Sequence, residues 1–245
     1  MREPKGVERE IARKTRRAFL VGGIAAVAGV GGVEWLKSRP AEDGVAWPFR
    51  EALRANESVA RAYFRPARLS REYPVKQAEQ PKANGDIGLD DDDAIANWKL
   101  VLEAPRGRQE LRLDAVQALP RVELTTELRC IEGWSTVVHW TGARFADFLA
   151  RYAPDARPAG YVGLETPDGA YYVGLEMASA LHPQTLLAYA MNGEPLTADH
   201  GAPLRLVTPV KYGIKNIKRI GRIRFTDNRP ADYWAERGYD WYAGL

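Results

Sequence analysis

The chain contains a single cysteine, Cys130, among 245 residues. One thiol excludes an intrachain disulfide framework, and it equally excludes a zinc or iron–sulfur site built from cysteines alone. A hydrophobic core must therefore hold the fold together. With 45% hydrophobic and 27% charged residues, the composition is that of a folded protein and not of a disordered or polytopic membrane chain. The length suits one large domain or two small ones.

The formal net charge of +3 belongs to the N-terminus alone. Residues 1–40 carry nine Lys and Arg against four Glu, a net of +5. The remaining 205 residues therefore carry 26 basic and 28 acidic side chains, a net of −2. A nucleic-acid-binding domain concentrates basic residues on its own surface. The sequence therefore predicts no nucleic-acid partner.

The order of residues near the N-terminus indicates an export signal. Thr15, Arg16 and Arg17 precede a run of 16 uncharged residues, 18–33, that contains five glycines. A basic region followed by a modest apolar segment is the anatomy of a signal peptide. Residues 15–20 resemble the twin-arginine signal S/T-R-R-x-F-L-K, with Val21 in place of the usual Lys. The run is shorter than the roughly 18–20 apolar residues of a spanning helix. Cleavage and retention as an anchor both stay open.

Beyond the signal, some short segments alternate as strands do and others have the helical period. Together they predict a mixed α+β fold in one domain. Residues 1–40 are predicted as the export signal, 41–69 as a linker with a helix over 50–63, and 70–245 as the folded domain. The predicted strands cover residues 96–103, 110–113, 123–130, 161–165, 171–174, 186–191, 204–207 and 220–225. The predicted short helices cover residues 114–119, 145–152 and 178–181. The acidic run 90–93 lacks the alternation and glycine of a calcium loop, so we predict a solvated turn there.

Cys130 alone has three interpretations: a buried core residue, a nucleophile or a metal ligand. Free cysteine is among the most buried residue types. A nucleophile needs a partner histidine, and His139, His182 and His200 show no recognisable spacing to it. A metal would hold the sulfur as a thiolate, which suits soft or high-valent transition metals. The residue by itself leaves these alternatives open.

The sequence around Cys130 resembles a known family. Residues 128–135, LRCIEGWS, followed by Trp140-Thr141-Gly142, resemble the segment that supplies the metal's cysteine in molybdenum enzymes of the sulfite oxidase fold. Further blocks of this family follow in its order: NGDIG at 84–88, HGAPLRL at 200–206, KYGIKNIK at 211–218 and the aromatic stretch 233–242. Together they cover about residues 70–245.

The resemblance implies an α+β, sulfite-oxidase-type molybdopterin-binding fold of mixed sheets and short helices in a single domain. It also implies a molybdenum–molybdopterin cofactor whose metal is bound by Cys130. The residues that the resemblance assigns to cofactor binding are Asn84, Ile87, Gly88, Cys130, Thr166, His200, Arg205, Asn216, Ile217 and Lys218. Molybdopterin ends in a phosphate, which requires cations, and we interpret Lys211, Lys215, Lys218 and Arg205 as that cationic end.

Within the family, the chain more closely resembles bacterial periplasmic oxidoreductases typified by the catalytic subunit of protein-methionine-sulfoxide reductase. Glu132 matches that group, and its carboxylate is either catalytic in proton transfer or a hydrogen-bond acceptor within the loop. The segment between Thr166 and Leu181 is shorter than in that reductase. Trp134 and the aromatic C-terminal stretch either line the site or build the core, and we favour the core.

The resemblance implies two-electron oxygen-atom transfer on a small sulfoxide or oxyanion, including methionine sulfoxide in proteins. The alternatives are a sulfite-oxidase-like dehydrogenase that passes electrons to a cytochrome, and a non-catalytic exported binding domain on the same fold. The sequence has no C-x-x-C-H haem motif and no dinucleotide fingerprint. We therefore expect a separate redox partner, either a haem-containing membrane quinol protein or a periplasmic cytochrome. We expect the twin-arginine machinery to deliver the protein to the periplasm, and we expect no added dimerisation domain.

Overall fold

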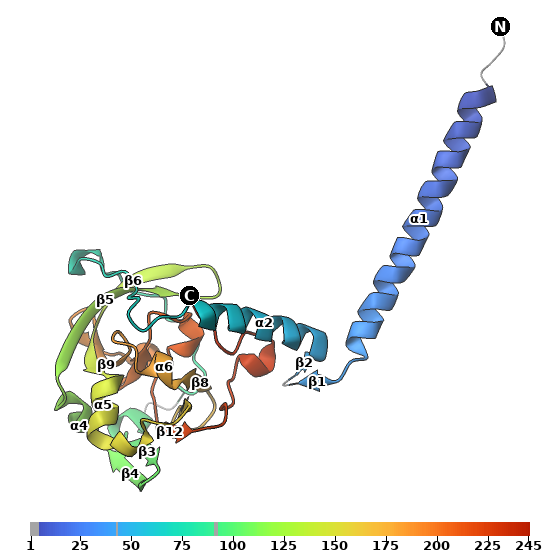
Figure 1. The fold of residues 1–245 in the computed structure, drawn as a ribbon. Coiled ribbons are helices and arrows are strands. Elements are labelled where there is room, and N and C mark those ends of the chain that lie inside the picture. Colours follow the sequence, from blue (N-terminus) through green and yellow to red (C-terminus); the bar gives the residue numbers. More distant parts are fainter. Residues whose placement is uncertain (1–4, 43, 91–92) are drawn as a thin grey trace. The chain divides into compact units, whose positions relative to one another are not determined.

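The computed structural model describes residues 5–42, 44–90 and 93–245. They form two compact units, Met1–Ala52 and Leu53–Leu245, and each unit is described by itself. The first unit contains the long helix α1 (Lys5–Lys37), the two-residue strands β1 (Ala41–Glu42) and β2 (Val45–Ala46), and the first residues of helix α2 (Trp47–Tyr63) (Figure 1).

Helix α1 extends beyond the uncharged run at both ends. Its segment Arg13–Lys37, 25 residues, is the one helix among the described residues that is long and apolar enough to cross a membrane. A signal sequence passes the same test of length and composition. The apolar segment was expected from the sequence to be too short to span a membrane. That expectation underestimated the length of the apolar helix, because it counted only consecutive uncharged residues.

The second unit is built on two five-stranded sheets. The first sheet has the strand order β10-β9-β6-β5, and β11 also pairs with β9; the second has the order β4-β3-β12-β7-β8. In the second sheet β12 pairs with β3 in parallel and with β7 in antiparallel orientation. The first sheet comprises β5 (Arg121–Arg129), β6 (Ser135–Arg144), β9 (Leu186–Met191), β10 (Glu194–Pro195) and β11 (Arg205–Val207). The second comprises β3 (Leu100–Ala104), β4 (Gly107–Leu111), β7 (Tyr161–Glu165), β8 (Tyr172–Glu176) and β12 (Arg222–Thr226).

Short helical segments connect the strands. The α-helices of this unit, besides α2, are α3 (Asp93–Ala96), α4 (Leu113–Gln117), α5 (Phe145–Tyr152) and α6 (Met177–Ala180). Single 3₁₀ turns lie at Val75–Gln77, Pro154–Ala156, Ala198–His200, Gly213–Lys215 and Ala235–Arg237. Helix α5 buries Phe145, Phe148 and Leu149 in the larger core cluster, together with Leu164 and Ile223 of the second sheet.

The hairpin β5–β6 determines where the cysteine lies. All nine residues of β5 pair with β6, and Arg129 faces Ser135 at the last position of the ladder. The connection is therefore only the five residues 130–134. The backbone N–H of Cys130 donates to the carbonyl of Trp134 at 2.9 Å, and Gly133 adopts a φ of +90° that favours glycine. This tight turn holds Cys130 at the tip of a long, well-paired hairpin.

Most of the predicted elements are present in the structure. The helix at Phe145–Tyr152 and the strands at Tyr161–Glu165 and Leu186–Met191 have the predicted bounds, and the helix predicted over 50–63 begins earlier, at Trp47. The strand predicted from residue 96 begins only at Leu100, because 93–96 form a helical turn. Residues 91 and 92 of the predicted acidic turn lie outside the described residues. The longest strand of the sheets, β6, was not predicted.

Candidate active site

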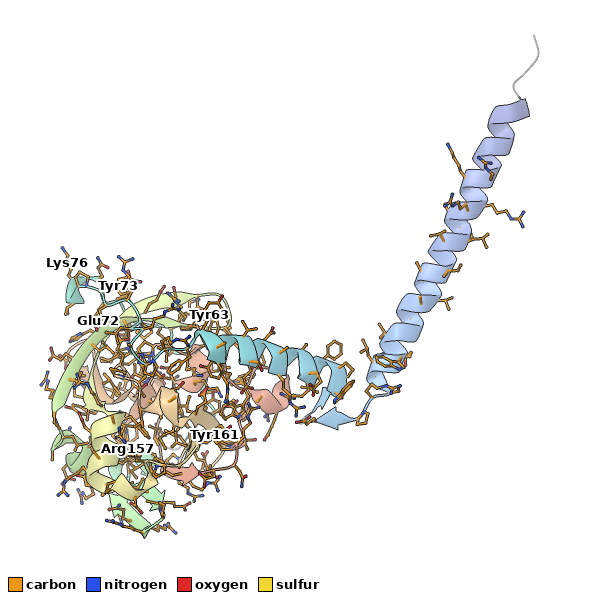
Figure 2. The ribbon with its side chains drawn as sticks, viewed as in Figure 1. Tyr63, Glu72, Tyr73, Lys76, Arg157 and Tyr161 are labelled. Carbon is orange, nitrogen blue, oxygen red and sulfur yellow. The ribbon has the colours of Figure 1, made fainter. Side chains whose placement is uncertain are left out.

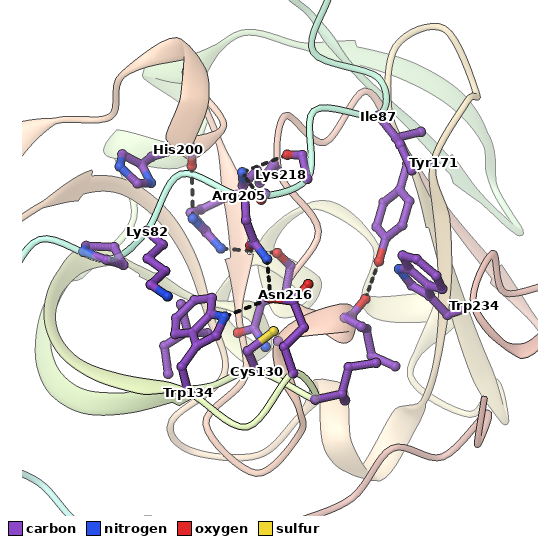
Figure 3. Close-up of a pocket in the computed structure, with 18 of the residues that line it drawn as sticks. Lys82, Ile87, Cys130, Trp134, Tyr171, His200, Arg205, Asn216, Lys218 and Trp234 are labelled. Atoms are coloured by element: carbon purple, nitrogen blue, oxygen red, sulfur yellow. Dashed lines mark hydrogen bonds between the residues drawn. The ribbon is translucent and has the colours of Figure 1, made fainter.

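A cavity lies where the β5–β6 turn, the 81–87 segment and the loops around residues 200–218 meet (Figure 3). The residues that line it are Pro81, Lys82, Asn84, Gly85, Ile87, Leu128, Cys130, Ile131, Glu132, Trp134, Tyr171, His200, Arg205, Gly213, Ile214, Asn216, Lys218, Trp234 and Tyr239. These residues come from segments far apart in the sequence, and they lie side by side only in the folded chain.

Cys130 is half-buried in this cavity. The loop that carries Gly213 packs behind it: a Cβ at position 213 would lie 3.3 Å from the carbonyl oxygen of Arg129 and 3.7 Å from the Cα of Cys130. Glycine thus permits the close approach of this loop to the cysteine. Among the described residues, no group of three or more His, Cys, Asp or Glu could hold a metal ion. A metal at Cys130 would therefore require ligands from a cofactor.

Glu132 lies two residues beyond the cysteine and is held from two sides. Its Oε2 accepts a hydrogen bond from Asn84 Nδ2 at 3.1 Å and another from Trp134 Nε1 at 2.9 Å. These bonds join the β5–β6 turn to the 81–87 segment across the cavity wall. The loop-binding interpretation of Glu132 thus has direct geometric support, and the arrangement also keeps a carboxylate beside Cys130.

Arg205 is a buried cation without a carboxylate partner among the described residues. Its Nη1 donates to the carbonyl of His200 at 3.0 Å and its Nη2 to the carbonyl of Asn216 at 3.2 Å, while its buried Nε has no partner. The guanidinium carbon lies 4.8 Å from the centre of the Trp140 ring. Burial lowers the pKa of Arg205 to about 10. An uncompensated buried guanidinium is unfavourable unless an anion binds beside it.

Lys218 adds a second cation at the same end of the cavity. Its Nζ donates to the carbonyls of Asn84 and Gly85 at 2.7 and 2.9 Å. Burial, together with the charge of Arg205, lowers the pKa of Lys218 to about 8. Burial lowers the pKa of His200 as well, followed by the charges of Arg205 and Lys218. The guanidinium, which has no carboxylate partner among the described residues, and the adjacent amine fit the terminal phosphate of a molybdopterin, and the cysteine in the same cavity fits its metal.

Two of the lysines interpreted as part of this cationic end are not part of it. Lys211 Nζ pairs with Glu176 Oε1 at 2.8 Å, and Lys215 Nζ pairs with Asp232 Oδ2 at 2.5 Å; neither lysine lines the cavity. That interpretation was wrong because the carboxylate partners lie far away in the sequence. Both lysines are structural, and of the four cations assigned to this end Lys218 and Arg205 line the cavity.

Most of the residues predicted for the site come together in the cavity. Those that line it are Asn84, Ile87, Cys130, Glu132, His200, Arg205, Asn216 and Lys218. Gly88, Thr166 and Ile217 do not line it. Gly88 has a φ of +78°, and a Cβ there would lie 2.5 Å from Thr166 Oγ1, so these two residues pack directly on each other. Ile217 belongs to the core. The cofactor contacts of these three residues stay predictions.

Several aromatic residues for which the core was favoured line the cavity instead. Trp134, Trp234 and Tyr239 take the alternative position at the site, whereas Trp241 and Tyr242 are buried as favoured. Tyr171, whose hydroxyl donates to the carbonyl of Ile214 at 2.6 Å, stands on the same wall as Trp234 (Figure 3). The closeness of Trp134 to Cys130 in the short turn was the available signal.

Lys82 is a further lining residue without a sequence prediction. Its Nζ lies 5.8 Å from the centre of the Trp134 ring. The residue precedes the NGDIG block by two positions and carries no motif of its own. It adds a positive charge next to the aromatic part of the cavity.

Comparisons with known proteins agree with this geometry. Residues 87–234 match the family described as "Oxidoreductase molybdopterin binding domain". The chain is 32% identical over 249 residues to a protein of Azospira oryzae provisionally named protein-methionine-sulfoxide reductase subunit YedZ1, covering 98% of this chain and 92% of that protein. It is 40% identical over 135 residues to the protein-methionine-sulfoxide reductase catalytic subunit MsrP of Xanthomonas campestris, where the match covers 49% of this chain and 42% of the relative.

Among solved structures, the sulfane dehydrogenase SoxCD from Paracoccus pantotrophus matches with a TM-score of 0.48 and 18% identity, over 67% of this chain and 46% of that one. The match to the family covers more than half of the chain, and the cavity contains the cysteine and the anion-binding end that the cofactor requires. The chain belongs to the oxidoreductase molybdopterin-binding domain family, and it is a molybdopterin-dependent oxidoreductase with the α+β fold of the sulfite oxidase type.

Proposed function

We propose that this enzyme reduces sulfoxides, with methionine sulfoxide in proteins as the substrate. The observation that carries the proposal is a cavity that joins Cys130, an anion-binding end and aromatic lining residues. The similarity to proteins named as methionine sulfoxide reductase subunits supports the choice of substrate. The reaction consumes two electrons and two protons, breaks the sulfur–oxygen bond, and releases a thioether and water.

The cofactor would be held between two ends of the cavity. Cys130 would supply the thiolate ligand of the molybdenum, and Arg205 and Lys218 would bind the phosphate. The other residues proposed to contact the cofactor are Asn84, Ile87, Gly88, Thr166, His200, Asn216 and Ile217. When bound, molybdenum–molybdopterin supplies the two-electron redox chemistry. The protein orients the substrate and controls its access to the cofactor.

The aromatic residues that line the cavity are the part of it that suits the substrate. Trp134, Trp234 and Tyr239 offer apolar ring faces, against which the methyl and methylene groups of a methionine side chain pack favourably. We propose that Glu132, fixed by Asn84 and Trp134, holds a proton near the sulfoxide oxygen. The variant Glu132→Gln keeps an oxygen acceptor for both donors but has no acidic proton. A changed pH profile of kcat at unchanged cofactor content would support proton transfer.

Lys82 favours a second candidate function. A cation that lines the cavity near Trp134 suits a small oxyanion such as sulfite, which a dehydrogenase would oxidise while it passes electrons to a cytochrome. The direction of reaction separates the two candidates. One consumes electrons from a donor, and the other delivers them to an acceptor.

A substrate screen of the holoenzyme tests the proposed function. A reduced viologen dye serves as donor for free methionine sulfoxide, methionine sulfoxide in an oxidised protein, and nitrate, and an oxidised dye serves as acceptor for sulfite. We expect dye oxidation with methionine sulfoxide, and none with the Cys130→Ala variant. Sulfite oxidation without any sulfoxide reduction would replace the proposal by the dehydrogenase.

We infer further that residues 1–40 direct export by the twin-arginine route, that 41–69 link the signal to the enzyme, and that 70–245 form the catalytic domain. Arg13, Lys14, Arg16 and Arg17 cluster at the N-terminal end of the apolar helix, which favours a cytoplasmic N-terminus and a periplasmic domain. Electrons would come from a haem-containing membrane quinol protein or a periplasmic cytochrome. The word "subunit" in the name of the Azospira oryzae relative is consistent with such a partner.

Replacement of the paired arginines tests the export route. With Arg16→Lys and Arg17→Lys together, the charge is kept while the motif is lost. We expect the enzyme to accumulate in the cytoplasm, as measured by cell fractionation. N-terminal sequencing of the exported wild-type protein shows whether the signal is removed or retained. Unchanged export of the double variant would contradict the twin-arginine route.

A further inference from the structure

A second cavity, of about 180 Å³, lies outside the candidate active site. Arg68, Arg71 and Arg129 line it together with Leu69, Tyr73 and Val210, and we call it the arginine groove. No described residue lines both this groove and the cofactor cavity. The segment 68–73, which forms one side of the groove, runs beside the hairpin β5–β6 (Figure 2).

The end of strand β5 borders both cavities. Successive side chains of a strand point to opposite faces. Leu128 lines the cofactor cavity, whereas its neighbours Glu127 and Arg129 line the arginine groove. Cys130 follows Arg129 directly and lies in the cofactor cavity. A molecule in the groove would therefore lie against the strand that leads to the cysteine, and it would leave the cofactor cavity open for a substrate.

The backbone that carries Arg68 and Arg71 is held firmly, although residues 68–73 belong to no helix and to no named strand. The buried side chain of Gln184 accepts a hydrogen bond from the N–H of Ser70 at 2.7 Å and donates one to its carbonyl at 3.0 Å. His182 Nε2 lies 3.1 Å from the carbonyl oxygen of Arg68. Groups that are fixed before binding lose little conformational entropy when a partner binds.

The acidic residues at the groove are already engaged. Glu127 pairs with Arg129 at 2.8 Å. Glu72 accepts a hydrogen bond from the same buried glutamine at 3.1 Å. Arg68 and Arg71 are exposed, and no carboxylate pairs with either of them within the described part of the chain. The groove therefore presents two guanidinium groups that can pair with carboxylates of another molecule.

The charge of this face differs from that of the domain as a whole. Residues 65–76 carry four basic side chains and one acidic side chain, a net of +3, whereas residues 41–245 carry a net of −2. Complementary charges steer a partner toward one face and fix its orientation. Leu69, which is 54% exposed, adds apolar area beside the arginines. Arginine and apolar area together suit an acidic protein surface.

We propose that the arginine groove is the docking site for the acidic face of the protein that donates electrons to the cofactor. The inference rests on the proposed function, in which each sulfoxide consumes two electrons from a donor. Electron transfer slows steeply with distance, and the groove borders the strand that leads to Cys130. Because donor and substrate would occupy different cavities, both can be bound during the reaction.

Sulfoxide reduction by the holoenzyme with two electron donors tests this inference. Reduced flavodoxin, an acidic protein, gives one electron per molecule, and two such electrons with two protons convert methionine sulfoxide to methionine and water. Reduced methyl viologen is a small cation and needs no basic docking site. The test variant is Arg68→Gln with Arg71→Gln. The matched control is Arg106→Gln with Arg108→Gln, which removes two exposed arginines outside the groove.

The measured quantity is the ratio of the flavodoxin-supported rate to the viologen-supported rate. We expect this ratio to fall at least about fivefold in the test variant and to stay close to wild type in the control. Added salt should slow the flavodoxin reaction of wild type more than that of the test variant. An equal ratio in the two double variants would overturn the docking site. So would an unchanged ratio with weaker binding of phosphatidylglycerol vesicles, which would assign the groove to lipid headgroups.

Direct binding separates this inference from the proposed function. The affinity of oxidised flavodoxin for the enzyme, measured by surface plasmon resonance, does not depend on the reaction. If neither donor supports sulfoxide reduction, the proposed function fails, and weaker flavodoxin binding by the test variant than by the control would still support the groove. Equal affinity of the two variants would overturn the docking site.

Discussion

At the scale of one residue, the buried charge of Arg205 makes the cavity suitable for an anionic cofactor. The guanidinium is buried, its only hydrogen-bond partners among the described residues are two carbonyls, and one buried N–H has no acceptor. Taking a charge out of water is unfavourable without a counter-charge. The phosphate of molybdopterin would supply both the missing charge and the missing acceptor. The free energy lost by burial of Arg205 is thereby regained on binding.

Replacement of Arg205 should therefore reduce cofactor binding. A hydrogen bond to a charged group contributes about 1.5–3 kcal/mol, which corresponds to roughly 10- to 150-fold in affinity. We expect Arg205→Met to contain at least about tenfold less molybdopterin than wild type when both are purified identically. The pterin is measured by fluorescence after oxidation. Arg224→Met, at an exposed position of β12, is the control. Full pterin content in a folded Arg205→Met variant would refute this role.

Lys218 makes anion binding dependent on pH. Its pKa in the cofactor-free protein is about 8, so it is charged below pH 8 and neutral above it. An anion raises this pKa, and the affinity is therefore constant below pH 8 and falls as the pH rises above 8. We expect pyrophosphate to bind the cofactor-free protein more weakly at pH 9 than at pH 7, as measured by calorimetry. In Lys218→Met this decrease should be much smaller. The same decrease in both proteins would exclude Lys218 as its source.

At the scale of single elements, the sequence predicted those whose pattern is local. Helix α5 was predicted with its observed bounds because Phe145, Phe148 and Leu149 repeat at the helical period. Strand β6 was missed, although Val137 and Val138 have high strand propensity, because its residues were considered only as part of a motif. The residues predicted to bind the cofactor were identified from motifs that a family shares. The local pattern of the sequence does not show that these residues lie together in the structure.

The errors at the site have a common physical cause. Lys211 and Lys215 were assigned to the cavity by their spacing in the sequence, whereas their partners Glu176 and Asp232 lie in other elements. A single sequence does not show which carboxylate reaches which lysine. The core was likewise favoured over the site for Trp234, which lines the cavity. Whether an aromatic residue faces the core or a cavity depends on how the C-terminal segment folds back.

Gly142 tests the packing of the first sheet. It sits at the irregularity in the pairing of β6 with β9, and a Cβ there would lie 2.3 Å from the carbonyl oxygen of Leu187 and 2.7 Å from the Cα of Ala188. Because both contacts are backbone in a central strand, Gly142→Ala should destabilise the fold by about 1–3 kcal/mol. Urea unfolding measures this. Gly160→Ala, whose Cβ would be 3.7 Å from its nearest neighbour, should be close to neutral. Equal stability of the two variants would contradict the tight strand pairing.

At the scale of the molecule, the C-terminal segment lines part of the cavity and is fixed by a buried ion pair. Lys215 Nζ binds Asp232 Oδ2 at 2.5 Å and the carbonyl of Gly174 at 2.9 Å. Asp232 precedes Trp234 by two positions, and Trp234 lines the cavity. The ion pair thus couples the second sheet to the cavity wall.

Removal of one partner of this pair should be far worse than removal of both charges. Lys215→Met leaves Asp232 buried and unpaired, which destabilises by about 3–5 kcal/mol. The double variant Lys215→Met with Asp232→Asn leaves no buried charge and keeps an acceptor, so it should recover part of that loss. A double-mutant cycle in urea measures the difference. Additive losses would show that the two side chains do not interact.

The central claim is that Cys130 holds the molybdenum of a molybdopterin cofactor in this cavity. The most direct measurement is metal and pterin analysis of protein purified from cells that make the cofactor, for wild type, Cys130→Ala and the control Ser135→Ala. Wild type and Ser135→Ala should contain molybdenum and pterin and reduce sulfoxide. Cys130→Ala should be inactive, and any pterin that it retains should be held by the Arg205 end. Absence of molybdenum from wild type, or full molybdenum-dependent activity in Cys130→Ala, would contradict the claim.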